Sequence, residues 1–241
     1  MPSSSAKKSP KSEKNEPSKM VCSFCKKEFV RELAFLEHMC EKKRRWGEQG
    51  TKHVVAGFRT YQRFYKSNNP RAREKTFEEF IHNRFYTDFV KFGRHLLDIN
   101  AINPDAFIDF LIKNQIRLSQ WQSPVVYETY VRELNKKESP DAAIERSFML
   151  MLQWANETGE PWTDFFRKIS PVLAVQWIQS GRISPWVIFT ASSAEEMISR
   201  FSEEQTVLVY KYIDPRFWEV RMRRAKDDVE KIKSELDSAG L

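Results

Sequence analysis

The sequence predicts an all-α fold, in which a multi-helix body follows an N-terminal tail and a small module of cysteine and histidine residues. Two observations support the helical body. Six prolines each follow a residue whose side chain can cap a helix, and apolar residues between them recur at steps of three and four. Proline suits the first position of a helix, because its missing N–H would have no helical partner there. The six pairs are Asn103-Pro104, Ser123-Pro124, Ser139-Pro140, Ser170-Pro171, Ser184-Pro185 and Asp214-Pro215.

The composition excludes several classes of protein. The 241 residues include 18 Phe and 7 Trp, too many aromatic residues for a chain that is disordered throughout. No segment approaches the ~20 consecutive apolar residues of a membrane span, and Met1-Pro2-Ser3 does not begin a secretory signal. We therefore expect no membrane association and a cytoplasmic location. The three cysteines, an odd number, favour metal ligation or burial over a disulfide framework.

The positive charge is concentrated in the N-terminal third. The whole chain carries 40 Lys and Arg against 33 Asp and Glu, a net charge of +7. Residues 1–75 hold 19 basic and 8 acidic residues, whereas residues 76–241 hold 21 and 25. Residues 1–20 have almost no apolar side chains, which predicts a disordered basic tail. A charge imbalance of this size favours a polyanionic partner, most often nucleic acid.

Residues 21–41 form a compact module with the spacing Cys-x2-Cys-x12-His-x-Cys. The candidate ligands and the two aromatic residues between them are Cys22, Cys25, His38, Cys40, Phe29 and Phe35. The pattern resembles the C2H2 zinc finger, whose knuckle supplies two thiolates and whose short helix supplies the other ligands beside a small apolar core. Zinc accepts tetrahedral sulfur and nitrogen ligands, and so small a module does not fold without help. We therefore expect a zinc-finger-like module with Zn2+ as its cofactor.

Two residues are candidates for the fourth ligand of this module. The family usually spaces its last two ligands so that both face one side of a helix, but Lys42 stands where that ligand would fall. Cys40 lies only two residues after His38, about 200° around an ideal helix, so it can bind only if the helix ends or tightens near His38. The alternative ligand is His53, donated from beyond the basic run.

Residues 42–75 are predicted to form a basic connector with interspersed aromatic residues. Residues 41–75 carry 11 basic and 3 acidic residues. Cations beside rings that can stack on bases are typical of proteins that bind single-stranded or forked nucleic acid. The alternative for Phe58, Tyr61 and Tyr65 is the buried face of a helix, because they are spaced three and four residues apart. The predicted nucleic-acid-binding residues are Lys42, Lys43, Arg44, Arg45, Lys52, Arg59, Arg63, Arg71 and Arg73.

Residues 76–241 are predicted to form the helical domain, with room for two subdomains. Apolar residues from Phe77 to Leu96 predict one long amphipathic helix. The final helix is expected to begin at Pro215 and to end before Gly240. Two capping-box patterns, Ser193-x-x-Glu196 and Ser202-x-x-Gln205, predict shorter helices.

The chain carries none of the common catalytic motifs. It has no P-loop, GxGxxG, GxSxG or HExxH. His82, His95 and Asp98 are the only candidates for chemistry in the helical domain, and one His with one Asp at helical spacing is more often a structural pair. We therefore predict a protein that is not an enzyme.

Three stretches of the helical domain resemble the DNA helicase-loading protein of T-even-type bacteriophages, a small basic all-helical protein of the replication fork. They are Phe77–Trp121, Val125–Leu134 and Val175–Ser192, which share its pattern of aromatic residues and helix starts. The resemblance implies binding to forked or single-stranded DNA, recruitment of a replicative helicase and contact with the single-strand binding protein, in the host cell cytoplasm. The zinc-finger-like module has no counterpart in that family.

The sequence predicts a nucleic-acid-binding accessory protein of a phage replication apparatus, and the choice between DNA and RNA stays open. The alternative is a structural or transcription-adaptor protein, in which the zinc module serves protein interaction. The two alternatives differ in the partner that would copurify with the protein.

Overall fold

The computed structural model describes residues 19–241 and confirms the all-α fold. Within these residues the chain forms fifteen α-helices, two short 3₁₀ turns and one two-stranded sheet. All but the last two residues of the predicted disordered tail, 1–20, lie outside the described residues. None of the helices within residues 19–241 is both long and apolar enough to cross a membrane.

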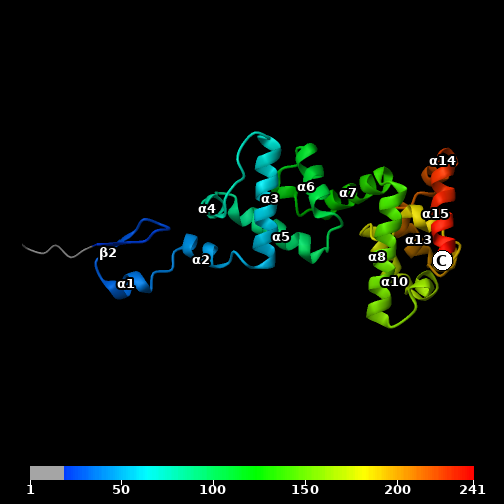
Figure 1. The fold of residues 1–241 in the computed structure, drawn as a ribbon, viewed down its shortest axis with the longest axis horizontal. Coiled ribbons are helices and arrows are strands. Elements are labelled where there is room, and N and C mark those ends of the chain that lie inside the picture. The colour runs from blue at the N-terminus through cyan, green and yellow to red at the C-terminus, as the bar shows by residue number, and fades with distance from the viewer. Residues whose placement is uncertain (1–18) are drawn as a thin grey trace, which may run out of the picture.

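The elements follow one another along the long axis of the molecule, from the blue N-terminal module to the red C-terminal helices (Figure 1). The first are β1 (Met20–Val21), β2 (Glu28–Phe29), α1 (Glu32–Leu36), α2 (Glu41–Gly47) and α3 (Lys52–Asn68). The next are α4 (Phe77–Ile81), α5 (Tyr86–Asp98), α6 (Pro104–Lys113), the 3₁₀ turn η1 (Leu118–Gln120) and α7 (Pro124–Lys137). The last group begins with α8 (Pro140–Thr158), η2 (Trp162–Asp164), α9 (Phe165–Lys168), α10 (Pro171–Gln179) and α11 (Pro185–Ile188). It ends with α12 (Ala194–Ser199), α13 (Glu203–Tyr210), α14 (Pro215–Arg224) and α15 (Lys226–Ser238).

The proline-based helix starts are confirmed, because all six prolines stand in the first turn of a helix, in α6, α7, α8, α10, α11 and α14. Four of the six preceding side chains accept a backbone N–H of the first turn. Ser184 does not, because its hydroxyl instead donates to Glu138 Oε2 at 3.0 Å in the protein interior. The capping box at Ser202 is also confirmed. The one predicted at Ser193 is wrong, because Ser193 has helical backbone angles and its hydroxyl is buried without a hydrogen bond.

Two predicted helices are each divided in two. The helix expected from Phe77 to Leu96 breaks between α4 and α5, where the Asn83 side chain accepts the backbone N–H of Phe85 at 2.8 Å and donates to the Tyr65 hydroxyl at 3.1 Å. The helix expected from Pro215 breaks at Ala225, and its second half ends as predicted before Gly240, which has a φ of +82°. The apolar spacing of the sequence does not reveal either break.

The predicted connector contributes a helix to the core. Val54 and Tyr61 of α3 are buried, and α3 lies directly against α5 (Figure 1). Gly57 and Gly93 allow this close approach: a Cβ on Gly57 would lie 2.7 Å from the carbonyl oxygen of Phe89, and one on Gly93 would overlap the carbonyl oxygen of His53. Residues 52–68 are thus held rigidly on the helical body, so the basic side chains they carry start from fixed backbone positions.

Candidate metal centre and nucleic-acid interface

Four side chains of the N-terminal module come together as the sequence predicts. The ligand atoms of Cys22, Cys25, His38 and Cys40 all lie within 4.8 Å of one another, and Cys25 Sγ is 3.2 Å from His38 Nε2. A tetrahedral zinc ion with bonds of about 2.0–2.3 Å needs ligand atoms roughly 3.5–3.8 Å apart. The arrangement therefore fits a single metal ion held by three sulfurs and one nitrogen.

The first two ligands are positioned by a β-hairpin. The strands β1 and β2 pair antiparallel, with Met20 opposite Phe29. Between them the Cys22 N–H donates to the Lys27 carbonyl oxygen and the Lys26 N–H donates to the Cys22 carbonyl oxygen, both at 2.9 Å. Lys26 closes this turn with a φ of +63°, a left-handed conformation that a side chain adopts at some cost. The turn presents both thiols to the same point.

The last two ligands lie outside the helix that the family pattern would place them on. α1 ends at Leu36, so His38 follows its C-terminus, and its ring lies 4.7 Å from the Phe29 ring at an angle of 46°. Cys40 is the N-cap of α2, where its sulfur accepts the Lys43 N–H at 3.4 Å. The condition set by the spacing, that the helix end near His38, is met. His53 stands elsewhere, at the start of α3, with Nε2 3.4 Å from Arg94 Nη2. The structure therefore places Cys40 with the other three ligands.

The thiols favour a metal on electrostatic grounds as well. A hydrogen bond from the Cys25 backbone N–H lowers the pKa of Cys22 to about 7, against the opposing effect of desolvation. The pKa of Cys25 is raised: the Lys27 backbone N–H opposes the shift, but desolvation and the neighbouring thiols outweigh it. The lowered pKa of Cys22 favours the thiolate form that binds a metal, and a bound cation would favour ionisation of Cys25 as well. The donor set is one that zinc prefers.

The metal module is fastened to the helical body through α2. The Trp46 ring lies 5.9 Å from Phe24 of the hairpin and 5.7 Å from Phe77 of α4. Arg45 donates to the Ile81 carbonyl oxygen at 2.8 Å, lies 4.3 Å from the centre of the Tyr86 ring and pairs with Glu41. Its side chain is only 14% exposed. Arg45, predicted to bind nucleic acid, therefore has an internal role.

The other predicted nucleic-acid-binding residues fall into two groups. Three form ion pairs: Arg59 with Asp105, Arg63 with both Asp105 and Asp109, and Arg73 with Glu79. The five that form no ion pair within residues 19–241 are Lys42, Lys43, Arg44, Lys52 and Arg71. Lys43 donates to the His38 carbonyl oxygen at 3.4 Å. The acidic partners on α6 lie 46 residues away in the sequence, so no local pattern identifies them.

The aromatic residues of the predicted connector lie mostly in the core. Tyr61 is buried, and Phe58, Phe64 and Tyr65 are partly buried against the same core cluster. Tyr61 lies 5.0 Å from Phe80 and 5.6 Å from Phe89 across the helix interface. The alternative that these rings form the buried face of a helix is therefore the one the structure adopts, and base stacking on Tyr61 is excluded.

The basic residues of α3 form a stripe on the opposite face of the same helix. At 100° per residue, Lys52, Arg59, Arg63 and Lys66 fall within about 60° of arc over a length of about 21 Å. The buried residues Val54, Gly57 and Tyr61 point the other way, at about 140–200° on the same scale. We call these four cations the α3 basic stripe. Its rigid support on α5 fixes the spacing of the four Cα atoms.

The two histidines of the helical domain named above lie at the end of α4 and within α5. His82 Nδ1 bonds to the Glu78 carbonyl oxygen at 2.8 Å, one turn back in its own helix. His95 Nε2 is buried without a hydrogen bond among the described residues. Burial lowers the pKa of His95, with the Asp98 carboxylate opposing the shift. The His82 contact is a local bond between a side chain and the backbone of the preceding helical turn.

Comparison with known proteins returned no match among family models, curated proteins or solved structures. The fold and the cluster of Cys22, Cys25, His38 and Cys40 are therefore described from the geometry of this chain, without support from a related protein.

Proposed function

We propose that this protein is a non-enzymatic nucleic-acid-binding accessory protein, in which the α3 basic stripe contacts the phosphate backbone. The observation that carries the proposal is the stripe itself. Lys52, Arg59, Arg63 and Lys66 share one face of a helix whose other face is fixed in the core, with the two lysines exposed and the two arginines paired with carboxylates of α6. Cations held at set spacing on a rigid helix neutralise successive phosphates without first ordering a flexible segment.

Further cations extend the proposed surface beyond α3. Lys42 and Arg44 of α2 and Arg71 of the following segment form no ion pair within the described part of the chain. Tyr61 is buried in the core and Phe58, Phe64 and Tyr65 are partly buried against it, so phosphate contacts are the main expected source of affinity. Such binding depends little on sequence and strongly on salt.

The most specific form of the proposal is a helicase loader of a phage replication apparatus. It rests on the resemblance of the helical domain to the T-even-type loading proteins. Its ligand would be forked or single-stranded DNA, its partners a replicative helicase or the single-strand binding protein, and its place the host cell cytoplasm. The location of the cations on α2, α3 and the segment after α3 agrees with a DNA-binding N-terminal half.

We further propose that the metal is Zn2+ and that its role is structural. Four protein ligands complete a tetrahedral site and leave no open position for substrate, unlike a catalytic zinc site with three. Its donors would be the sulfurs of Cys22, Cys25 and Cys40 and Nε2 of His38. The ion would supply the fold of the module, which presents α2 to the helical body.

The test of nucleic-acid binding is a salt titration with forked and single-stranded DNA. Replacing Lys52, Arg59 and Lys66 together with Gln should lower the slope of log K against log salt by about 2 for a single strand. The control replaces Lys168, Lys211 and Arg223 with Gln, which removes the same number of exposed cations from the helical domain away from α3, and should leave the slope unchanged. Affinity that is independent of salt, or equal losses in both variants, would refute the proposal.

A second function is favoured by the surface of the metal module. Val30, Leu33, Leu36 and Met39 are 62–73% exposed there, on and around the five-residue α1. Apolar side chains in these places suit a protein contact better than base edges or phosphates. In the alternative structural or transcription-adaptor role, replacing Leu33 and Leu36 with Ser would abolish copurification of a capsid, tail or polymerase partner. Copurification of a helicase instead would support the loading role.

A further inference from the structure

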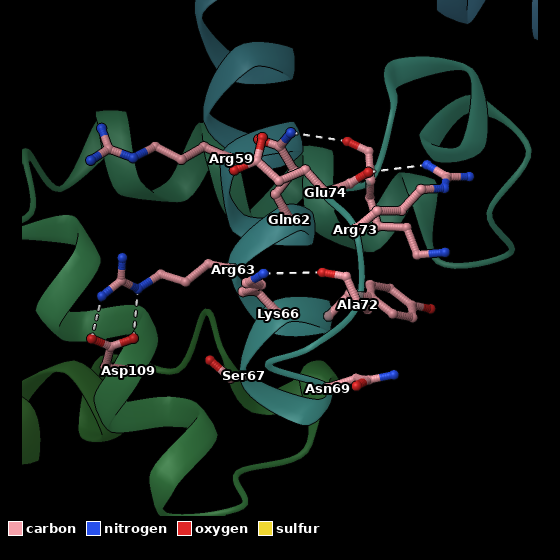
Figure 2. A pocket seen from close by; sticks show the side chains of 12 residues that line it. Arg59, Gln62, Arg63, Lys66, Ser67, Asn69, Ala72, Arg73, Glu74 and Asp109 are labelled. Atoms are coloured by element: carbon pink, nitrogen blue, oxygen red, sulfur yellow. Dashed lines mark hydrogen bonds and ion pairs between the residues drawn. The ribbon is translucent and has the colours of Figure 1, made fainter.

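A hollow of about 590 Å³ lies between α3 and residues 69–75 (Figure 2). This volume is typical of small-molecule sites, which span about 300–1,000 Å³. Its lining includes two acidic residues, Glu74 and Asp109, and more than twice as many basic ones. The basic lining residues are Arg59, Arg63, Lys66, Arg73 and Lys75. Because Arg59, Arg63, Arg73 and Lys75 pair with Asp105, Asp109 and Glu79, the net excess of positive charge is small, and an anionic ligand is favoured where it takes the place of these carboxylates.

The wall of the hollow is held in place by hydrogen bonds across it. Gln62 Nε2 donates to the Lys75 carbonyl oxygen and Lys66 Nζ donates to the Ala72 carbonyl oxygen, each at 3.0 Å (Figure 2). The Ala72 N–H in turn donates to the Asn69 carbonyl oxygen at 3.0 Å. These bonds tie residues 69–75 to α3, so that a ligand meets a preformed site.

The cations stand on both sides of the exposed face of α3. Figure 2 shows the guanidinium groups of Arg59 and Arg63 directed toward α6, and Arg73 on the side of residues 69–75. The three arginines of these ion pairs are 36–69% exposed and their carboxylate partners 27–49%, and pairs at the surface contribute only about 0–1 kcal/mol each. A phosphate group, which offers more charge than one carboxylate, can therefore replace these partners. Lys66 forms no ion pair within residues 19–241, and a phosphate would take the place of the Ala72 carbonyl oxygen to which its Nζ donates.

The remaining lining groups suit a base rather than a bare anion. Tyr65 is half-buried and lines the hollow, with the Lys75 ammonium 5.6 Å from its ring centre. The side chains of Gln62 and Asn69 add amide groups beside it. An aromatic edge, amides and cations together match a nucleotide, whose phosphate and base need different contacts.

We propose that this hollow binds one phosphate-bearing nucleotide unit, with the phosphate on Lys66 and Arg73 and the base beside Tyr65. The ligand can be a free mononucleotide or one unit of a nucleic-acid strand crossing α3, since both offer the same chemistry. In the second case the inference rests on the proposed function and locates one contact within it. An acidic peptide lacks the base and is the competing ligand.

The test measures binding of thymidine 5′-monophosphate to the full chain by calorimetry and by amide chemical shifts. Thymidine, inorganic phosphate and hexaglutamate serve as comparison ligands. The nucleotide should bind best and shift the amides of Gln62, Asn69 and Lys75. Replacing Lys66 and Arg73 with Gln should weaken it tenfold or more, whereas the matched pair Lys168→Gln and Arg223→Gln should change it less than twofold. Arg73→Gln alone, which removes only exposed contacts, should weaken it at least threefold.

Each other outcome overturns the inference. Equal binding of thymidine would exclude a phosphate contact, and equal binding of inorganic phosphate would exclude a base contact. Tighter binding of hexaglutamate would assign the hollow to an acidic peptide. Salt-dependent binding of forked DNA without any nucleotide response in the hollow would refute the inference and leave the proposed function standing. Loss of both would refute both.

Competition between thymidine 5′-monophosphate and a labelled strand of forked DNA distinguishes the two sources of the ligand, a free nucleotide and a unit of a nucleic-acid strand. If the nucleotide unit belongs to a strand, thymidine 5′-monophosphate should compete with the strand, and the Lys66 and Arg73 variant should weaken both ligands. If the hollow serves a free nucleotide, the variant should weaken the nucleotide tenfold and leave DNA affinity within twofold. A variant that weakens only the DNA would contradict both forms.

Discussion

Removal of the metal should unfold the N-terminal module and leave the helical body folded. Among residues 19–41 only Cys22 is buried, so the module has almost no core of its own. Full burial of one side chain contributes about 1.5–3 kcal/mol, whereas structural zinc contributes roughly 10–16 kcal/mol in zinc-finger peptides at pH 7. The metal is therefore the dominant stabilising contribution in this segment.

The helical body has its own support. Phe80, Phe89, Phe92 and Trp121 are fully buried in a core that contains none of the metal ligands. Cys22→Ser with Cys25→Ser should thus reduce bound zinc from about one equivalent to near zero. Hydrogen exchange should lose its protection in residues 20–47, while the amides of α5 and α10 keep theirs.

Two single substitutions sharpen this prediction. Cys40→Ser should release zinc under mild chelation while its hydroxyl still caps α2, whereas His53→Gln should retain the metal. The contact of Trp46 with Phe24 and Phe77 gives a further signal, because module unfolding exposes the indole ring. The reasoning would be refuted by a metal-free protein with a protected module, or by zinc loss in His53→Gln but not in Cys40→Ser.

Three further predictions concern stability, affinity and pH. Gly93→Ala should destabilise the protein by about 1–3 kcal/mol or more, since its Cβ meets backbone of α3, whereas Gly47→Ala, with open space around it, should be close to neutral in chemical denaturation. Asp105→Asn with Asp109→Asn should raise DNA affinity several-fold and, at the higher salt where the arginines otherwise keep their carboxylates, steepen the salt slope by about 1.4 for a single strand, because two arginines are released. His95 should make the protein less stable as pH falls below about 6.5, since its lowered pKa means that the unfolded chain binds the proton more readily, and His95→Gln should remove this dependence.

Each of these predictions has a result that contradicts it. Equal stability of both glycine variants would mean that α3 and α5 do not touch through backbone. Unchanged or lower DNA affinity after loss of the two α6 carboxylates would mean that Arg59 and Arg63 take no part in binding. An unaltered pH dependence of unfolding in His95→Gln would assign that dependence to other groups.

The sequence predicted features that depend on a few neighbouring residues. The proline helix starts need only a capping side chain and the fixed φ of proline, and the Cys22 and Cys25 knuckle needs only a short turn. Cys40 could be the fourth ligand on one condition, that the helix before it ends near His38. The structure meets this condition, because α1 ends at Leu36. These features follow from local geometry and were accessible without the fold.

Features set by distant contacts were not accessible in the same way. The break between α4 and α5 depends on Asn83 reaching Tyr65, 18 residues earlier in the chain. Ser184 does not cap its helix because its hydroxyl donates a hydrogen bond to Glu138, 46 residues away. The same holds for Arg59 and Arg63, whose acidic partners come from α6. Helical spacing alone cannot say which carboxylate a surface cation will meet.

These ion pairs reduce the part of the positive charge in the N-terminal third that is directly available to a polyanion. A polyanion on α3 must exchange Asp105 and Asp109 for phosphates, so each arginine contributes only the difference between two charged contacts. Exposed pairs contribute about 0–1 kcal/mol, and release of counterions from a strand favours the exchange most at low salt. Lys52 and Lys66, which have no ion pair within residues 19–241, make their contacts without this loss. Binding along α3 should therefore begin at the two lysines and recruit the two arginines as salt falls, which gives a single-strand salt slope that rises from about 1.4 to about 2.8 in magnitude.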